Sequence, residues 1–342
     1  MAPLRSLGNI LSAFNDFYAR TGKDAVSSAP PPELEASGGT KITSGSDTYH
    51  VFLYTGSPQS FTVANAPGSL TAKLLVVGGG GSGGFTADGV SGGGGAGGVQ
   101  YYTSYPITDG TTTVVVGNRG ANPGTNSDYT SDPSINDGED TTFGNAVGYG
   151  GGGGAHQAPG VRNETGHNGG SAGGGSSYPY PGQPGGTATQ PGAPLVSGAG
   201  GTNYGNAGGE GMDSNPGVGG GGGGSELSGR PGDTPPAGKG GDGQAFPEYP
   251  GPVLAPAIPS TNVTTIGPTG LFAGGGAGGP GAPGTRPGGA GGGGSSGPGT
   301  SASDGTDATG YGSGGSGTQF GASNTNASPA GTAGIVIVKY SS

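Results

Sequence analysis

Apolar residues near the start of the chain recur at the spacing of one helix face. Between residues 4 and 19 they fall three or four positions apart, with Ser6 as a candidate cap and Gly22 as a candidate stop. The pattern predicts an amphipathic helix within residues 1–22, and its apolar positions include Leu7, Ile10, Leu11, Phe14 and Phe17. Two interpretations stay open. The helix packs on its own domain, or it docks on a host structure or pairs with other copies.

Residues 23–47 lack such a periodicity. They are rich in Pro, Ser and Glu and contain three consecutive prolines, Pro30 to Pro32. Proline-rich segments of this kind form semi-rigid extended spacers. We therefore expect residues 23–47 to separate an N-terminal anchor from the body of the protein.

Short apolar or alternating runs bounded by turn residues predict β-strands at both ends of the body. The last run, GIVIVKY, is apolar without interruption, which is typical of a strand covered on both faces, and its natural partner is the similar run at 74–77. We therefore expect the strand of residues 334–342 to pair with, and so close, the set of β-strands within residues 48–149. The predicted strands are 48–54, 60–64, 71–77, 99–104, 111–117 and 334–340.

Residues 150–333 hold few large apolar residues and many of the chain's 90 glycines. Side-chain burial cannot order such a segment, because glycine loses the most backbone entropy on folding. Extended left-handed helices of polyproline-II geometry can order it if they pack side by side and each amide meets a neighbour's carbonyl, a spacing that only glycine permits. The alternative is a set of individually irregular loops held by other contacts.

The fold class expected from these patterns is mainly β with polyglycine-II helices. A small antiparallel β framework encloses a sandwich of glycine-rich extended helices, and one short α-helix stands at the N-terminus.

Composition and motifs argue against nucleic-acid binding, a membrane span and dinucleotide binding. The chain has no Cys, a net charge of −10 and no basic stripe for nucleic acid, and no apolar run is long enough to span a membrane. Gly78, Gly80 and Gly83 match a dinucleotide fingerprint, but the next residues cannot form the helix that the fingerprint requires. We expect no enzyme activity, cofactor or metal.

Two groups of residues remain as candidates for binding. The segment 126–140 is rich in Asp, which fits a solvated turn better than a calcium site, although the sequence does not decide between them. Aromatic residues interrupt the glycine-rich half, and rings in loops on a stiff scaffold are typical of recognition surfaces. The same rings would equally shield the edge of a glycine sandwich. The candidate receptor contacts are Tyr178, Tyr180, Tyr204, Phe246 and Tyr249.

The order of several sequence motifs along the chain resembles that in a known protein family. KLLVVGGGGSGG, GGGGAGGVQYY, TTTVVVGNRG and the terminal GTAGIVIVKY are similar to the glycine-rich domain of bacteriophage tail-fibre and virion structural proteins, notably those of marine cyanophages. The opening MAPLRSLGNILSAFNDFYARTGKDAV also resembles the N-terminus of cyanophage virion proteins. The polyglycine runs are similar to those of the tail-fibre-tip adhesins of T-even-like phages, where stacked polyglycine helices display loops that bind the host surface.

The resemblance implies a virion-attached fibre or adhesin, located on the extracellular particle. Its expected partners are other virion proteins through the N-terminal helix and a protein or glycan of the host surface, with a homo-oligomer, such as a trimer, as the assembled form. The alternative is a purely structural virion component, a capsid decoration or short fibre, without a receptor of its own.

Overall fold

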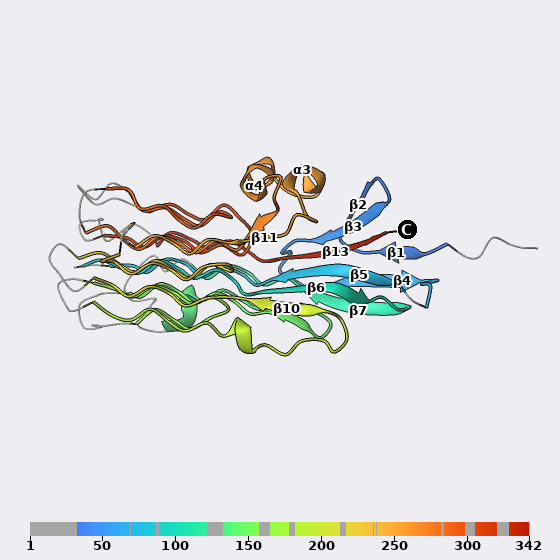
Figure 1. The fold of residues 1–342 in the computed structure, drawn as a ribbon, viewed down its shortest axis with the longest axis horizontal. Coiled ribbons are helices and arrows are strands. Elements are labelled where there is room, and N and C mark those ends of the chain that lie inside the picture. The colour runs from blue at the N-terminus through green and yellow to red at the C-terminus, as the bar shows by residue number, and fades with distance from the viewer. Residues whose placement is uncertain are drawn as a thin grey trace, which may run out of the picture.

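The computed structural model is elongated, with β-sheets at one end and glycine-rich segments running lengthwise at the other (Figure 1). Its strands are antiparallel in every described pair, so the protein is mainly β. The structure describes residues 33–68, 70–86, 89–121, 133–156, 165–177, 182–212, 217–234, 236, 238–281, 284–297, 305–319 and 328–341.

Two sheets pack face to face at the sheet end. A six-stranded sheet has the order β10-β6-β5-β13-β3-β2, and a five-stranded sheet has the order β1-β4-β7-β8-β9. The six strands are β2 (Thr40–Ser44), β3 (Asp47–Phe52), β5 (Thr71–Val77), β6 (Val99–Pro106), β10 (Gly201–Tyr204) and β13 (Ile335–Ser341). The other five are β1 (Glu35–Ser37), β4 (Gln59–Ala64), β7 (Gly110–Val115), β8 (Thr141–Phe143) and β9 (Ala146–Gly148).

Alternate residues of β5 and β13 enter two different hydrophobic cores. Leu74, Val76 and Val338 pack toward Phe61 and Phe143 of the five-stranded sheet. The intervening Leu75, Val77 and Ile337 pack on the opposite face. As the apolar run predicts, β13 is buried on both faces, and it pairs with β5 so that Ile335 lies opposite Val77 and Val338 opposite Leu74.

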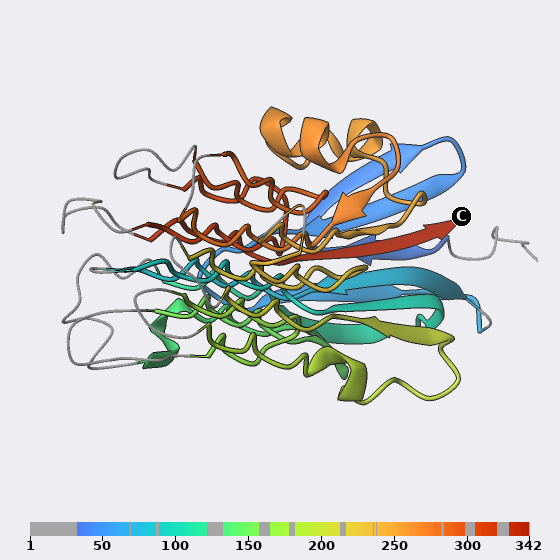
Figure 2. The ribbon, with the colours of Figure 1, turned by 60° about the vertical axis from the view of Figure 1, so that its left-hand side comes forward.

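Two short helices cover the outer face of the six-stranded sheet (Figure 2). They are α3 (Gly251–Leu254) and α4 (Ser260–Ile266), flanked by the small sheet of β11 (Gln244–Ala245) and β12 (Leu271–Phe272). Leu254, Ile258 and Ile266 join the core beneath them. We call the two larger sheets together with α3 and α4 the strand framework. Two 3₁₀ helices, η2 (Pro133–Asn136) and η3 (Gln190–Gly192), lie outside it.

Strands of the framework continue directly into the glycine-rich segments. β5 leads into residues 78–86, residues 89–98 lead into β6, and residues 328–334 lead into β13. We call the glycine-rich segments together the glycine array. Its described members are 78–86, 89–98, 117–121, 136–140, 149–156, 165–177, 182–189, 205–212, 217–232, 238–243, 273–281, 284–297, 305–319 and 328–334.

Hydrogen bonds in the glycine array repeat every three residues. In segment 78–84 every third amide donates to segment 92–98, the next amide in each triplet donates to segment 136–139, and the third donates to segment 329–332. The distances lie between 2.8 and 3.0 Å, as in the pairs Gly81 N to Gly95 O (2.9 Å) and Gly80 N to Thr332 O (2.8 Å). Successive amides of one segment therefore point to three different neighbours.

Segment 92–98 lies at the centre of the glycine array and has six neighbours. Its amides donate to segments 149–155, 220–223 and 312–318, and its carbonyls accept from segments 78–84, 171–174 and 276–279. There is no room for side chains on its glycines. A Cβ on Gly94 would lie 2.3 Å from the Gly81 carbonyl oxygen, and one on Gly97 would lie 2.0 Å from that of Gly78, far inside van der Waals contact.

The six strands expected from the sequence are present, but two expectations about the rest of the chain are wrong. Residues 35–44, placed in the spacer of residues 23–47, form β1 and β2, because Ile42 is buried in the core and β2 pairs with β3. Residues 150–333 do contribute large side chains to a core, through the α3–α4 region. The helix predicted within residues 1–22 lies outside the described residues.

In the part of the chain that the structure describes, no helix is long and apolar enough to cross a bilayer.

Candidate functional site

The molecule has two ends of different character. The described chain enters at β1 and leaves at β13, both at the sheet end (Figure 1). Segments of the glycine array extend to the opposite end, which we call the far end. Residues outside the described part of the chain join several of these segments in the sequence, and we call them the connections. The described residue pairs that flank the connections are 86 and 89, 121 and 133, 156 and 165, 177 and 182, 212 and 217, 281 and 284, 297 and 305, and 319 and 328.

Larger side chains reappear where the glycine array approaches the far end. The rings of Phe85 and His156 stack with centroids 5.4 Å apart, and both residues are buried. Val90 forms isolated bridges to Ser177 and Gln319. Burial, together with the smaller effect of the nearby His167, lowers the pKa of His156 to about 4. These residues fix the last layer of the glycine array, from which the connections start.

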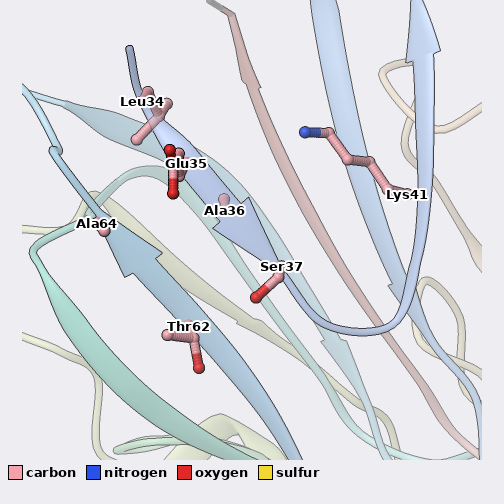
Figure 3. Close-up of a pocket in the computed structure, with 7 residues that line it drawn as sticks. All are labelled: Leu34, Glu35, Ala36, Ser37, Lys41, Thr62 and Ala64. Atoms are coloured by element: carbon pink, nitrogen blue, oxygen red, sulfur yellow. The ribbon is translucent and has the colours of Figure 1, made fainter. Parts of the chain in front are cut away.

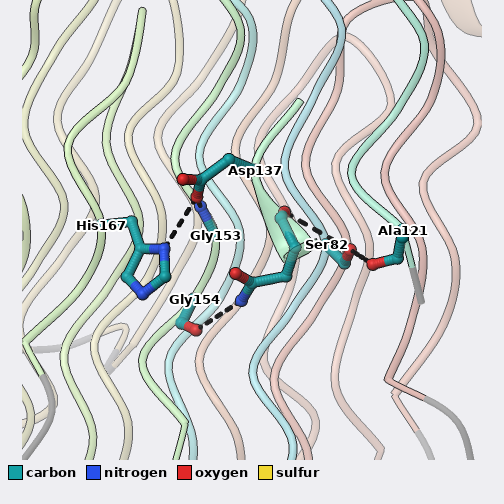
Figure 4. A network of polar contacts seen from close by, with 7 residues as sticks. Ser82, Ala121, Asp137, Gly153, Gly154 and His167 are labelled. Carbon is teal, nitrogen blue, oxygen red and sulfur yellow. Dashed lines mark hydrogen bonds and ion pairs between the residues drawn. The ribbon is translucent and has the colours of Figure 1, made fainter. Parts of the chain in front are cut away.

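Carboxylates replace missing neighbours along one flank of the glycine array. Asp137 Oδ1 accepts hydrogen bonds from the Gly153 amide at 2.6 Å and from His167 Nδ1 at 2.8 Å (Figure 4). Three residues earlier along the same segment, the Gly150 amide donates to Asp140 Oδ1 at 2.8 Å. These amides have no backbone carbonyl to meet, because the glycine array ends here. The side chains of Asp137 and Asp140 therefore cap it.

This capping accounts for part of the Asp-rich segment. Besides Asp137 and Asp140, Glu139 Oε2 accepts from the Asn118 amide at 3.0 Å. Asp128 and Asp132 lie outside the described residues. Among the residues that are described, no group of three or more His, Asp or Glu side chains is placed to hold a metal ion.

The candidate nucleotide fingerprint is part of the glycine array. The amides of Gly80 and Gly83 donate to the carbonyls of Thr332 and Pro329, and the Gly78 amide donates to Gly98. Amides that are already bonded in this way cannot cradle a phosphate, and none of the residues described between Gly83 and β6 is helical.

A hollow opens at the sheet end between the edges of the two sheets. It has a volume of about 350 Å³ and is lined by β1, by Lys41 of β2, and by Thr62 and Ala64 of β4 (Figure 3). Gly38 and Gly39, with φ of +113° and +59°, let the chain cross from one sheet to the other here. A second hollow of about 630 Å³ adjoins it and shares Leu34 and Lys41.

Another pair of hollows lies on the side of the molecule, on either side of Arg119. One has a volume of about 480 Å³ and is lined by neutral residues of several segments besides Arg119. The other, of about 560 Å³, includes Asp137 and Glu139 in its wall. Sequence analysis does not single out Arg119, because the residues around it come from distant parts of the chain.

Comparison with known protein families gives a match over most of the chain. A family model described as a glycine-rich domain matches residues 55–341. The chain belongs to the glycine-rich domain family. No curated protein matches the sequence. The matched residues run from the turn before β4 to the end of β13, so this glycine-rich domain includes most of the strand framework and the described glycine array.

Two of the aromatic residues predicted to contact a receptor are in the core of the glycine-rich domain. Tyr249 is fully buried and Phe246 is 3% exposed. Tyr204 is partly buried, and its ring lies edge-on to Phe246 at 5.5 Å. The prediction is therefore wrong for Phe246 and Tyr249, because their rings fill the space between the six-stranded sheet and the helices.

The remaining predicted residues lie outside the described part of the chain. These are Tyr178 and Tyr180, between the described residues 177 and 182 in the sequence, and the attachment candidates Leu7, Ile10, Leu11, Phe14 and Phe17.

Proposed function

We propose that the segments of the glycine array are polyglycine-II helices. A helix with three residues per turn directs successive amides toward three neighbours, and the hydrogen bonds of segment 92–98 repeat with this period. The approach of the backbones also leaves no space for a Cβ. An experimental structure tests the proposal: torsion angles near φ −75° and ψ +145° are expected, about the polyproline-II values, and scattered angles would refute it.

We propose that the protein is a phage virion fibre or adhesin that presents loops on a rigid glycine scaffold for binding to the host surface. The observation that carries this proposal is the polarity of the molecule. The described chain enters and leaves at the sheet end, whereas the described residues that flank the connections lie at the far end. Attachment through residues 1–22 then leaves the far end pointing outward.

The physics of the glycine array supports the same proposal. Its interior glycines accept no larger residue, because the backbones are in contact. We propose that the connections are free of this constraint, so that their sequences can change while the scaffold stays the same. Binding residues are commonly placed on loops that a rigid scaffold positions.

The test compares two ends of the same protein. In one variant, residues 178–181, which include Tyr178 and Tyr180, are replaced by Gly and Ser at equal length. In the control, the exposed turn residues 55–58 at the sheet end are replaced in the same way. Binding of the purified protein to host cells is expected to fall for the far-end variant and to stay unchanged for the control. Equal binding by both variants would refute the receptor role of this connection.

The burial of Phe246 and Tyr249 favours a second candidate. Because these rings stabilise the core, fewer aromatic residues are left for a receptor, as expected for a purely structural virion component. Labelling intact particles with an antibody against the protein separates the candidates. Signal at the tip of a fibre supports the adhesin, and an even distribution over the capsid supports the structural component.

A further inference from the structure

We propose that the neutral hollow beside Arg119 binds an acidic saccharide, a sugar that carries a single carboxylate. This site lies on the side of the molecule and does not depend on the role proposed for the far end. Its volume of about 480 Å³ falls within the usual range of small-molecule sites. The lining residues on which the inference rests are Asn118, Arg119, Thr261, Asn262, Thr309 and Tyr311.

Arg119 supplies the charge. The side chain is exposed, and it makes no hydrogen bond or ion pair with any residue that the structure describes. By contrast, Lys73, Lys239 and Lys339 are all paired with carboxylates. An unpaired guanidinium is suited to bidentate recognition of a carboxylate. One cation on a chain of net charge −10 attracts a single carboxylate but repels a polyanion such as nucleic acid.

The other polar residues supply neutral hydrogen-bonding groups. The amide and hydroxyl side chains of Asn118, Asn262, Thr261 and Thr309 match a ligand that is rich in hydroxyl groups, which both donate and accept. None of the described residues that line this hollow is a carboxylate, in contrast to the neighbouring hollow with Asp137 and Glu139. Ala308, Ala333 and the ring of Tyr311 provide an apolar wall for the carbon face of a sugar.

The walls of the hollow are held in place before any ligand arrives. The Glu139 amide donates to the Asn118 carbonyl at 2.9 Å, and the Ala308 amide donates to the Ala330 carbonyl at 2.9 Å. Asn262 Nδ2 donates to the Thr309 carbonyl at 2.8 Å, which ties the start of α4 to the glycine array. A preorganised site loses little conformational entropy on binding, so a small sugar suffices as ligand.

The experiment titrates the full-length, ¹⁵N-labelled protein with galacturonic acid, a sugar with one carboxylate, and follows its amide signals by NMR. We expect shifts of Asn118, Arg119, Asn262 and Thr309, and a dissociation constant that rises about tenfold in Arg119→Gln. The control is Lys41→Gln, which removes an exposed cation at the sheet end and should bind as the unmodified chain does. Because the Arg119 side chain is exposed, both variants should fold.

Four outcomes would overturn the proposal. If galacturonic acid leaves these amides unshifted, the hollow does not bind the sugar. If Arg119→Gln binds it as tightly as the unmodified chain does, or if neutral galactose binds equally well, the carboxylate is not recognised. If inorganic phosphate shifts the same amides as strongly as the sugar does, the hollow is a general anion site and the saccharide assignment is wrong. None of these outcomes depends on whether the far end binds host cells.

Discussion

The strand framework and the glycine array are both buried, but different atoms fill them. The interior of the framework consists of side chains such as Leu74, Leu75 and Phe143, which are at most 1% exposed. In the array the peptide groups themselves are in contact, and the fully buried Ala96 and Ala155 are among the few side chains there. The framework should therefore be sensitive to the removal of atoms, and the array to their addition.

The largest expected effect is from adding one methyl group to the array. In Gly222→Ala the new Cβ would lie 2.0 Å from the Gly94 carbonyl oxygen, and segment 92–98 cannot retreat because it has six neighbours of its own. We expect a loss of at least about 4 kcal/mol in the free energy of unfolding, measured by chemical denaturation.

The matched control is Gly192→Ala. Gly192 is exposed, and a Cβ there would meet no atom within 4 Å. This variant should unfold at the same denaturant concentration as the unmodified protein. If Gly222→Ala were as stable as the control, the close approach of the backbones would be wrong.

The opposite change tests the framework. Leu75→Ala removes a side chain that is fully buried in the centre of β5, between β6 and β13. The cavity should cost about 3 kcal/mol in the free energy of unfolding. Leu227→Ala, at a position that is 49% exposed, serves as the control and should have almost no effect. A small loss in Leu75→Ala would indicate that backbone hydrogen bonds dominate the framework as well.

Acid should weaken the far end of the array through His156. Because burial lowers the pKa of His156 from 6.5 to about 4, the unfolded chain takes up a proton at higher pH than the folded chain. Stability is therefore full above pH 6.5 and falls as the pH decreases toward 4, by about 2–3 kcal/mol for this group. His156→Phe keeps the stacked ring and removes the proton.

Denaturation curves between pH 4 and 7 check this expectation, and the variant should lose less stability than the unmodified chain. Part of the slope should remain, because burial also lowers the pKa of His50 in the framework. An unchanged slope in His156→Phe would contradict the burial of this imidazole.

The two regions also differ in how far their structure follows from the sequence. Runs such as TAKLLVV and GIVIVKY predict β5 and β13, their pairing and their burial on both faces, because periodicity and apolar content determine a side-chain core. A run such as GGGGAGG carries no comparable signal. Its neighbours are decided by backbone contacts between segments as distant as 92–98 and 312–318, which no local pattern encodes.

The same limit explains the errors at the candidate site. Phe246 and Tyr249 stand among prolines and glycines, a context that predicts an exposed loop, yet α3 and α4 fold back over the six-stranded sheet and bury both rings. β1 and β2 are short and mostly polar, so Ile42 is almost the only signal for them. Arg119 becomes a candidate only when the structure brings residues 118, 262 and 309 together.

The smallest of these effects concerns the flank where the array meets water. Asp137→Ala removes the carboxylate oxygen that accepts from both the Gly153 amide and His167 Nδ1, and a buried amide that loses its acceptor destabilises the fold. We expect a loss of about 1–2 kcal/mol in the free energy of unfolding, and faster hydrogen exchange at the Gly153 amide while Gly95 in the centre stays protected. Asp233→Ala is the control, since the only described partner of this exposed carboxylate is the adjacent Thr234. Equal exchange at Gly153 in both variants would mean that the carboxylate does not cap the array, and that water satisfies its edge as well as a side chain does.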